Sequence, residues 1–269
     1  MLIGFIGLGN MARAIIAGMR ENDSFRNASI LGNDHNDDKC IELRERWGVA
    51  ILEDDISVAR QADLLVLAVK PQALPVLFER IVPARKPGQC TLSLAAGKSL
   101  SWLAKALGAE APLIRAIPNV AARVGSSVTA LCANGQANEA QKALVTVMFN
   151  AVGKTVWMTE ERMKAFSALT GAAPAFTFLY LEALASAGLR AGLPKKMALE
   201  AACNMMIGAA KLALKTDEHP ACLIDQVTSP GGTTIDGIHA LKALGFEHAV
   251  HEAIAAVIRK DNSMSVDIK

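Results

Sequence analysis

The stretch LIGFIGLGNMA, residues 2–12, decides the fold of this chain. Its first five residues, Leu2–Ile6, form an uninterrupted apolar run, which predicts a strand buried on both faces. Gly7, Gly9 and Ala12 follow at the spacing G-x-G-x-x-A, just before a segment with helical spacing of apolar residues. The order of strand, glycine turn and helix predicts the start of a parallel βαβ unit.

Each small residue of this turn suits the binding of a dinucleotide. Gly7 makes the tight turn, Gly9 lets the backbone approach a pyrophosphate, and Ala12 lets the helix pack against the strand. The N-terminus of the helix adds N–H groups and a partial positive charge. Glycines that serve packing alone are the alternative. The expected cofactor contacts in this turn are Ile6, Gly7, Leu8, Gly9, Asn10 and Met11.

Outward from this motif, short apolar runs alternate with amphipathic stretches, which indicates an α/β fold with a parallel sheet. Strands are expected at residues 2–6, 29–31, 64–69, 90–94, 114–117, 128–132 and 155–157. Helices are expected at residues 11–20, 39–47, 72–81 and 139–149. Together they predict an N-terminal Rossmann domain over residues 1–158.

The pattern changes after about Thr159, where strand signals end and only long helical stretches remain. These stretches are rich in alanine and apolar on more than one face, as in 197–214, so a single copy would expose much apolar surface. We therefore expect a C-terminal all-helical domain, residues 159–269, that forms a homodimer.

Composition excludes several classes of protein. The 269 residues are 52% hydrophobic and 20% charged, which predicts a globular chain with a large core. Its 28 Lys+Arg and 26 Asp+Glu are mixed along the sequence, so no basic block suggests nucleic acid or an anionic membrane. The five cysteines form no C-x-x-C pair and mostly lie in apolar stretches, which predicts reduced, buried thiols in a cytoplasmic protein. The histidines show no metal-binding spacing.

Neither a signal peptide nor a membrane span is expected. Leu2 already begins a strand, so no basic segment or cleavage site precedes it. The apolar stretch 169–193 contains Pro174, Glu182 and Arg190, which favours a helix buried by protein over a transmembrane helix.

The ends of the strands supply the other candidate cofactor contacts. Asp34 follows the second strand at the spacing where an acid holds a ribose 2′-hydroxyl and favours NAD, whereas Asn33 and His35 offer hydrogen bonds to a 2′-phosphate. Capping of the next helix is the alternative. Two later strands end at the expected switch point of the sheet, in Ala68, Val69, Lys70 and Pro71 and in Ala95, Ala96 and Gly97. Lys70 either lines the nicotinamide or substrate end or is a plain loop lysine.

A second motif, DQVTSPGGTTI at residues 225–235, breaks one helix and begins another. Thr233 or Thr234 can cap the second helix, so that free N–H groups converge in a nest that suits a carboxylate. An ordinary corner between two helices is the alternative.

At these motifs the sequence resembles the pyrroline-5-carboxylate reductases over essentially its whole length. The shared stretches are GFIGLGNM at 4–11, AVKP at 68–71, RAIPN at 115–119, GLRAGLP at 188–194, GAAK at 208–211 and TSPGGTTI at 228–235. The first is common to other Rossmann enzymes, whereas the last is close to diagnostic. The resemblance implies reduction of 1-pyrroline-5-carboxylate to L-proline with NADPH, or alternatively NADH, in a dimer that in some members assembles into a decamer.

The resemblance also implies roles for single residues. The loop would hold the substrate carboxylate through Ser229, Gly231, Gly232 and Thr233. The Thr234 hydroxyl would lie by the ring nitrogen, where it orients and polarises the imine but is too weakly acidic to be the proton source. Asp217 would touch the substrate site, in its own subunit or across the dimer.

Four positions depart from the family pattern. Ala172 and Phe176 lack the two hydroxyls of the usual Gly-Ser-Gly-Pro-Ala-Tyr, so neither hydroxyl is essential here. Asp34 stands where many bacterial members carry Arg, and Asp55 lies near the usual place of an Asn; we count both among the cofactor contacts. Both changes lie on the ribose side and weaken the implied preference for NADPH.

Two other functions share this architecture. A β-hydroxyacid dehydrogenase would need a catalytic Lys in the stretch 171–184, which has none. A dinucleotide-binding scaffold would not need to keep Thr233 and Thr234. Of the other polar residues, His219 is expected at a helix end, and Arg115 and Asn119 either approach the site or bond to the backbone.

Overall fold

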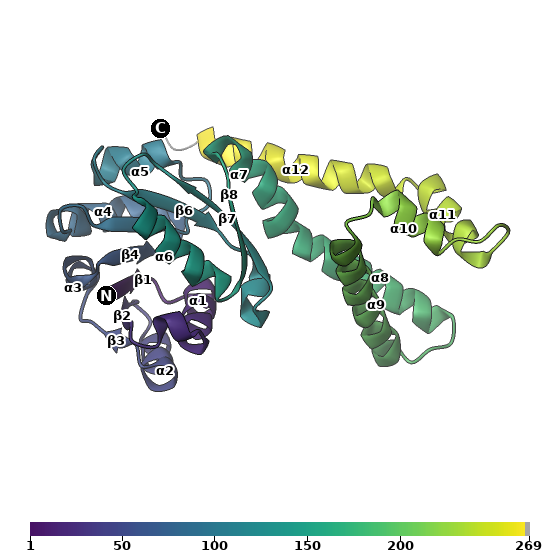
Figure 1. The fold of residues 1–269 in the computed structure, drawn as a ribbon, viewed down its shortest axis with the longest axis horizontal. Coiled ribbons are helices and arrows are strands. Elements are labelled where there is room, and N and C mark those ends of the chain that lie inside the picture. The colour runs from purple at the N-terminus through teal and green to yellow at the C-terminus, as the bar shows by residue number, and fades with distance from the viewer. Residues whose placement is uncertain (267–269) are drawn as a thin grey trace. The chain divides into compact units, whose positions relative to one another are not determined.

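A computed structural model describes residues 1–266 of the chain. It contains two compact units (Figure 1). The first comprises Met1–Gly171 together with the described residues from Lys260 onward, and the second comprises Ala172–Arg259. The sequence-based domain boundary at 158/159 stays a prediction. The helix that follows it, Glu160–Ser167, packs in the first unit, where Met163 lies against Ala130 and Cys132.

The first unit is built on one eight-stranded sheet of order β3-β2-β1-β4-β5-β6-β7-β8. Neighbouring strands are parallel except β6 and β7, which are antiparallel. The strands are β1 (Leu2–Ile6), β2 (Ser29–Asn33), β3 (Ala50–Ile51), β4 (Leu64–Leu67), β5 (Cys90–Ser93), β6 (Leu113–Ile117), β7 (Ser127–Ala133) and β8 (Gly153–Trp157). This arrangement confirms the predicted Rossmann sheet.

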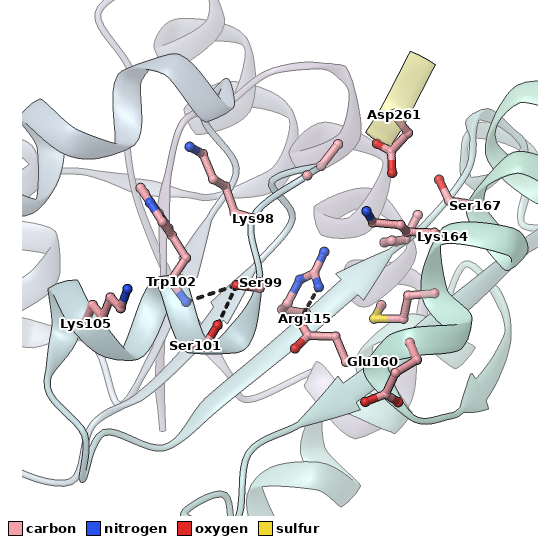
Figure 2. Close-up of a pocket in the computed structure, with 15 residues that line it drawn as sticks. Lys98, Ser99, Ser101, Trp102, Lys105, Arg115, Glu160, Lys164, Ser167 and Asp261 are labelled. Carbon is pink, nitrogen blue, oxygen red and sulfur yellow. Dashed lines mark hydrogen bonds and ion pairs between the residues drawn. The ribbon is translucent and has the colours of Figure 1, made fainter. Parts of the chain in front are cut away.

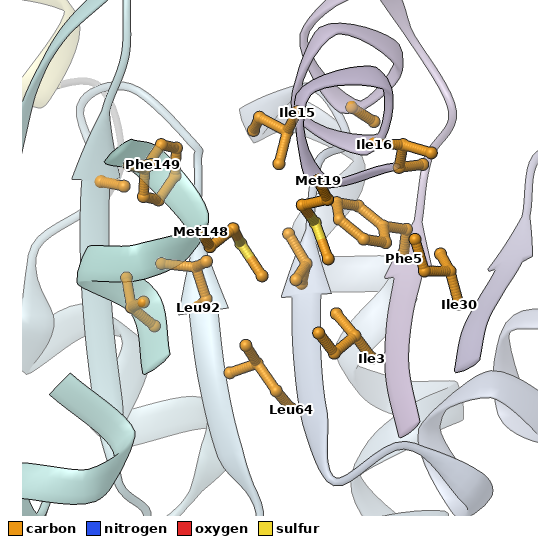
Figure 3. Packing of buried hydrophobic residues seen from close by; sticks show 14 of the residues in the cluster. Ile3, Phe5, Ile15, Ile16, Met19, Ile30, Leu64, Leu92, Met148 and Phe149 are labelled. Carbon is orange, nitrogen blue, oxygen red and sulfur yellow. The ribbon is translucent and has the colours of Figure 1, made fainter. Parts of the chain in front are cut away.

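Helices cover both faces of the sheet, because alternate residues of a strand point to opposite sides. In β4, Leu64 and Val66 pack into one core cluster with α1 and α6, whereas Leu65 and Leu67 pack into the other with α3, α4 and α5. Figure 3 shows Ile15 and Met19 of the first cluster. The helices of this unit are α1 (Asn10–Glu21), α2 (Asp37–Trp47), α3 (Asp55–Gln61), α4 (Leu74–Ile81), α5 (Leu100–Leu107), α6 (Glu139–Asn150) and α7 (Glu160–Ser167).

The strands and helices expected from the sequence are present, with different ends. β4 stops at Leu67 instead of residue 69, and a 3₁₀ turn, Pro71–Ala73, precedes α4. Among the strands and α-helices of this unit, β3, α3 and α5 were not expected. The last two begin at capping side chains, since Asp54 accepts a hydrogen bond from the Ser57 N–H and Ser99 accepts one from the Trp102 N–H.

The second unit is all-helical, as predicted. It holds α8 (Ala173–Arg190), α9 (Lys195–Thr216), α10 (Pro220–Gln226), α11 (Thr233–Ala243) and most of α12 (Phe246–Val266). A π-helical turn, Ala168–Ala172, leads into α8. Helices α8 and α9 approach closely, because a Cβ at Gly188 would lie 2.7 Å from the Cβ of Ala198. Glycine at this position therefore lets the two helices form a hairpin.

The helix over residues 169–193 was expected to be buried by protein, and its own chain leaves much of it exposed, in line with the expectation that a single copy exposes much apolar surface. Phe178 and Leu179 are 62% and 72% exposed, and Leu214 on α9 is 79% exposed. By length and composition alone, Glu160–Arg190 and Lys195–Thr216 are apolar enough to span a membrane, which is weak evidence of a membrane protein. Apolar surface on this scale marks a site of association.

The cysteines only partly match the prediction of buried thiols. Cys40, Cys90 and Cys132 are buried, whereas Cys203 is half-buried and Cys222 is exposed. Burial raises the pKa of Cys90 to about 12 and that of Cys132 to about 11, so both are protonated and unreactive at neutral pH. Cys222 contradicts the prediction because α10 leaves it uncovered within one chain.

Candidate functional site

The turn after β1 has the geometry that its sequence predicts. Gly7 adopts a φ of +91°, which disfavours any residue with a side chain. Its N–H donates to the Asn33 carbonyl at 2.9 Å, and a Cβ at this position would lie 2.8 Å from the carbonyl oxygen of Ala68. Gly7 is therefore required by the fold itself, because the turn must pass close to the loop after β4.

Gly9 has a different environment. Its φ of −72° suits any residue, and a Cβ there would meet no atom within 4 Å. It occupies the N-cap of α1, where no side chain caps the helix and no acidic residue lies in the first turn. Neither backbone conformation nor packing needs a glycine here. The open space above an uncapped helix N-terminus fits a phosphate group, so these residues suit a dinucleotide.

Three of the predicted segments meet at one edge of the sheet. Strands β1, β4 and β5 are adjacent and parallel, so the segments that follow them, Ile6–Met11, Ala68–Pro71 and Ala95–Gly97, share the carboxyl edge. The first two touch, since a Cβ on Gly7 would lie 3.0 Å from Cγ1 of Val69. Lys70 is exposed. This edge is where an open α/β sheet binds its ligand.

Asp34 lies directly across from the glycine turn. Its side chain is only 4% exposed, and Oδ2 accepts a hydrogen bond of 2.7 Å from the Leu8 N–H. Oδ1 accepts one of 3.0 Å from the Asn36 N–H, and Nζ of Lys39 lies 3.3 Å from both oxygens. Burial alone would raise the pKa of this carboxyl, but these hydrogen bonds outweigh it and lower the pKa.

The alternative of helix capping applies to Asn36, whose side chain accepts a hydrogen bond from the Lys39 N–H at the start of α2. Two other expected cofactor contacts use their side chains within the protein. The side-chain amide of Asn33 donates a hydrogen bond to the carbonyl of Leu52. Oδ1 of Asp55 forms an ion pair with Nη2 of Arg80 at 2.8 Å. Sequence spacing gave no sign of these partners.

A cavity of about 440 Å³ lies beside the β5–α5 loop (Figure 2). Its lining includes Ala96 and Gly97 of the loop, Lys98, and Arg115 of β6 with Glu160 of α7. The latter two form an ion pair in which the Arg115 side chain is 8% exposed. Arg115 is thus a buried structural residue, and Glu160 is a partner that the sequence did not indicate.

Lys98 lies in the lining of the same cavity. Burial disfavours the charged form of its amine and so lowers the pKa of Lys98.

The side chain of Asn119 forms hydrogen bonds with backbone groups. Its side chain accepts a hydrogen bond from the Ala121 N–H and donates one of 3.0 Å to the Thr170 carbonyl. Of the two roles left open by the sequence, the structure shows backbone hydrogen bonding.

The second motif forms the turn between α10 and α11, within the second unit. Gly231 has a φ of +68°, and the Gly232 N–H donates to the Ser229 carbonyl at 3.0 Å. The N-cap of α11 is Gly232, and no side chain caps this helix. The expected capping by Thr233 or Thr234 is therefore wrong: both lie in the first helical turn, exposed. The helix N-terminus keeps its N–H groups for another partner.

The segment before this turn has two unusual residues. Asp217, at the C-cap of α9, has a φ of +56°, and no other described residue except glycine has a positive φ. Nδ1 of His219 accepts a hydrogen bond from the Ala221 N–H at 3.2 Å, which confirms its expected place at a helix end.

Among residues 1–266 no cluster of three His, Cys, Asp or Glu side chains is placed to bind a metal.

Two protein families match this chain, one in each half. Residues 160–264 match the family described as pyrroline-5-carboxylate reductase dimerisation. Residues 2–97 match the family described as NADP oxidoreductase, coenzyme F420-dependent. The first match covers the helical unit and the second covers the glycine turn.

Curated relatives match the chain from end to end. The pyrroline-5-carboxylate reductase of Escherichia coli (strain K12) is 34% identical over 263 residues, which cover 98% of each chain. That of Synechocystis sp. is 37% identical over 263 residues, which cover 97% of each.

Solved structures give the same result. A pyrroline-5-carboxylate reductase from Coxiella burnetii superposes with a TM-score of 0.90 at 33% identity, over 97% of each chain. A 1-pyrroline-5-carboxylate reductase from Streptococcus pyogenes superposes with a TM-score of 0.87 at 34% identity, over 98% of each. That of Plasmodium falciparum, solved with NADP bound, gives 0.88 at 25% identity. With its glycine turn and helical unit, the chain belongs to the pyrroline-5-carboxylate reductase family of NAD(P)H-dependent oxidoreductases.

Proposed function

We propose that this chain reduces the C=N bond of 1-pyrroline-5-carboxylate to L-proline, the last step of proline biosynthesis, with hydride from NADPH or NADH. The observation that carries this proposal is the glycine turn after β1, where the N-terminus of α1 is uncapped and a Cβ at Gly9 would meet no atom within 4 Å, so that a phosphate can approach the backbone. Similarity to reductases over nearly the whole chain supports the substrate.

The first unit would hold the cofactor. The Gly7–Met11 turn and the N-terminus of α1 would bind the pyrophosphate, with the ribose side at Asn33, Asp34 and Asp55. The segments Ala68–Pro71 and Ala95–Gly97 would line the nicotinamide half. The bound dinucleotide supplies the hydride, and the protein contributes alignment and exclusion of water.

The turn before α11 would hold the substrate. The uncapped helix N-terminus and the exposed hydroxyls beside it suit a carboxylate, through Ser229, Gly231, Gly232 and Thr233. Thr234 would donate a hydrogen bond that orients and polarises the imine. A threonine hydroxyl is too weak an acid to protonate the nitrogen, so that proton comes from solvent or arrives with the substrate. Asp217 would contact the substrate from its own or the neighbouring subunit.

We further propose that the protein is a cytoplasmic homodimer, in which the helical unit of one copy covers that of the other. The exposure of Phe178, Leu179 and Leu214 supports this arrangement. Five such dimers would form a decamer, which mass photometry would distinguish from the dimer.

The test follows the absorbance of NADPH, and separately of NADH, when the purified protein meets 1-pyrroline-5-carboxylate. The proposal predicts loss of absorbance with proline as the product. Binding of both dinucleotides without oxidation would contradict the reductase and favour a dinucleotide-binding scaffold.

A further inference from the structure

The carboxylate of Asp34 is a fixed negative charge beside the dinucleotide turn. It is held by the N–H groups of Leu8 and Asn36 from two different segments, and its lowered pKa keeps it ionised at neutral pH. Because the side chain is only 4% exposed, it has little freedom to turn away from a ligand. A ligand bound next to the turn would therefore lie close to this charge.

The cations nearby already have acidic partners. Lys39 faces Asp34 itself, with Nζ 3.3 Å from each oxygen, and Arg13 of α1 forms an ion pair with Glu42 of α2. His35, the other basic group at Asp34, lies 3.5 Å from Oδ1 and is 94% exposed.

Two further acids, Asp37 and Asp38, occupy the first turn of α2 and are exposed. The end of β2 thus presents three carboxylates against one lysine, and of these three it is Asp34 that accepts a hydrogen bond from the glycine turn. Such a site offers no unpaired arginine fork for a phosphate.

The two nicotinamide cofactors differ at this end of the molecule. An acid after the second strand of such a domain hydrogen-bonds the ribose 2′-hydroxyl of NADH, and NADPH carries a phosphate on the same oxygen. That phosphate has roughly two negative charges at neutral pH. Repulsion by a carboxylate a few ångströms away amounts to a factor of about ten or more in affinity.

We propose that Asp34 determines the dinucleotide preference of this chain and ranks NADH above NADPH. The same carboxylate also positions the glycine turn through Leu8, so its two effects must be separated experimentally. The kinetic part of this proposal rests on the proposed reductase function, whereas the binding part does not.

The test compares the wild-type protein with Asp34→Asn and with the control Asp37→Asn, all as full-length chains. Asparagine keeps an oxygen that accepts from Leu8 but removes the charge. Asp37→Asn removes an equal charge three residues along, from a side chain for which no contact with the glycine turn is seen. Isothermal titration calorimetry without substrate gives Kd for NADH and NADPH, and initial rates give kcat/KM for each.

We expect the wild-type protein to bind NADH about tenfold or more tightly than NADPH. Asp34→Asn should lower Kd for NADPH about tenfold and raise Kd for NADH, while Asp37→Asn changes their ratio less than about twofold. Tighter binding of NADPH by the wild-type protein would overturn the proposal, and so would equal weakening of both cofactors in Asp34→Asn. Cofactor binding in the expected order without turnover would contradict only the reductase function.

Discussion

Glu160 and Arg115 form an ion pair that joins the start of α7 to β6, and the same carboxylate accepts a hydrogen bond of 2.7 Å from the Leu100 N–H at the start of α5. One side chain thus links three elements around the loop that carries Ala95–Gly97. Because the Arg115 side chain is 8% exposed, loss of its partner would leave a charge without compensation.

Glu160→Ala should therefore lower the free energy of unfolding by about 2–4 kcal/mol. The matched control is Glu139→Ala, which removes a 90% exposed partner of Lys142 and should cost less than about 1 kcal/mol. Urea unfolding followed by circular dichroism measures both. Equal small effects would show that the Arg115 pair does not stabilise the fold.

Gly9→Ala should separate cofactor binding from folding. A methyl group at this position would meet no protein atom, and alanine readily adopts the φ of −72° found here. The loss of stability should therefore stay below about 1 kcal/mol. Affinity for the dinucleotide should fall about tenfold or more, because the methyl occupies the space of the pyrophosphate. Titration calorimetry and thermal unfolding test the two halves.

Gly7→Ala is the contrasting variant. It needs an unfavourable φ of +91° and places a Cβ 2.8 Å from the Ala68 carbonyl oxygen, so it should destabilise the protein itself. For the Gly9→Ala variant of the preceding prediction, an unchanged affinity for the dinucleotide would show that the turn does not bind the cofactor.

Thr234→Val should reduce kcat about tenfold or more while Kd for the dinucleotide changes little, because valine keeps the shape and removes the hydrogen bond that we propose to the imine. Thr234→Ser retains a hydroxyl and should recover much of the rate. Steady-state kinetics with each variant provide the measurement. Equal rates for the valine variant and the wild-type protein would exclude Thr234 from the mechanism.

Leu179→Glu should weaken the homodimer. Leu179 is 72% exposed on α8 within one chain, and a charge buried in a subunit interface is costly. Val76→Glu, at a 63% exposed position on α4 of the first unit, is the control and should leave assembly unchanged. Mass photometry of both variants decides the point: dimers that persist in Leu179→Glu would place the interface elsewhere.

Local pattern explains why the first unit was predictable. The apolar runs at Leu2–Ile6 and Leu64–Leu67 face helices on both sides, so burial leaves an unmistakable signal in sequence. The glycine turn after β1 was equally visible, because the positive φ of Gly7 and the open space at Gly9 both belong to the spacing G-x-G-x-x-A. Short elements such as β3, two residues long, carry too little pattern to detect.

Partners distant in sequence were not predictable. The hydrogen bond between Asp34 and Leu8 joins residues 26 positions apart, and the ion pair of Arg115 with Glu160 joins residues 45 apart. The exposed apolar surface of the helical unit was predictable, because its stretches are apolar on more than one face, but apolar spacing does not show which residues a second copy covers.

The most direct measurement uses NADH carrying deuterium in both positions at C4 of the nicotinamide, with 1-pyrroline-5-carboxylate and the purified protein. Mass spectrometry of the product should show L-proline with deuterium at the former imine carbon, because the hydride passes directly from C4 to that carbon. Binding of NADH and substrate without labelled proline would contradict the assignment of this chain as a pyrroline-5-carboxylate reductase.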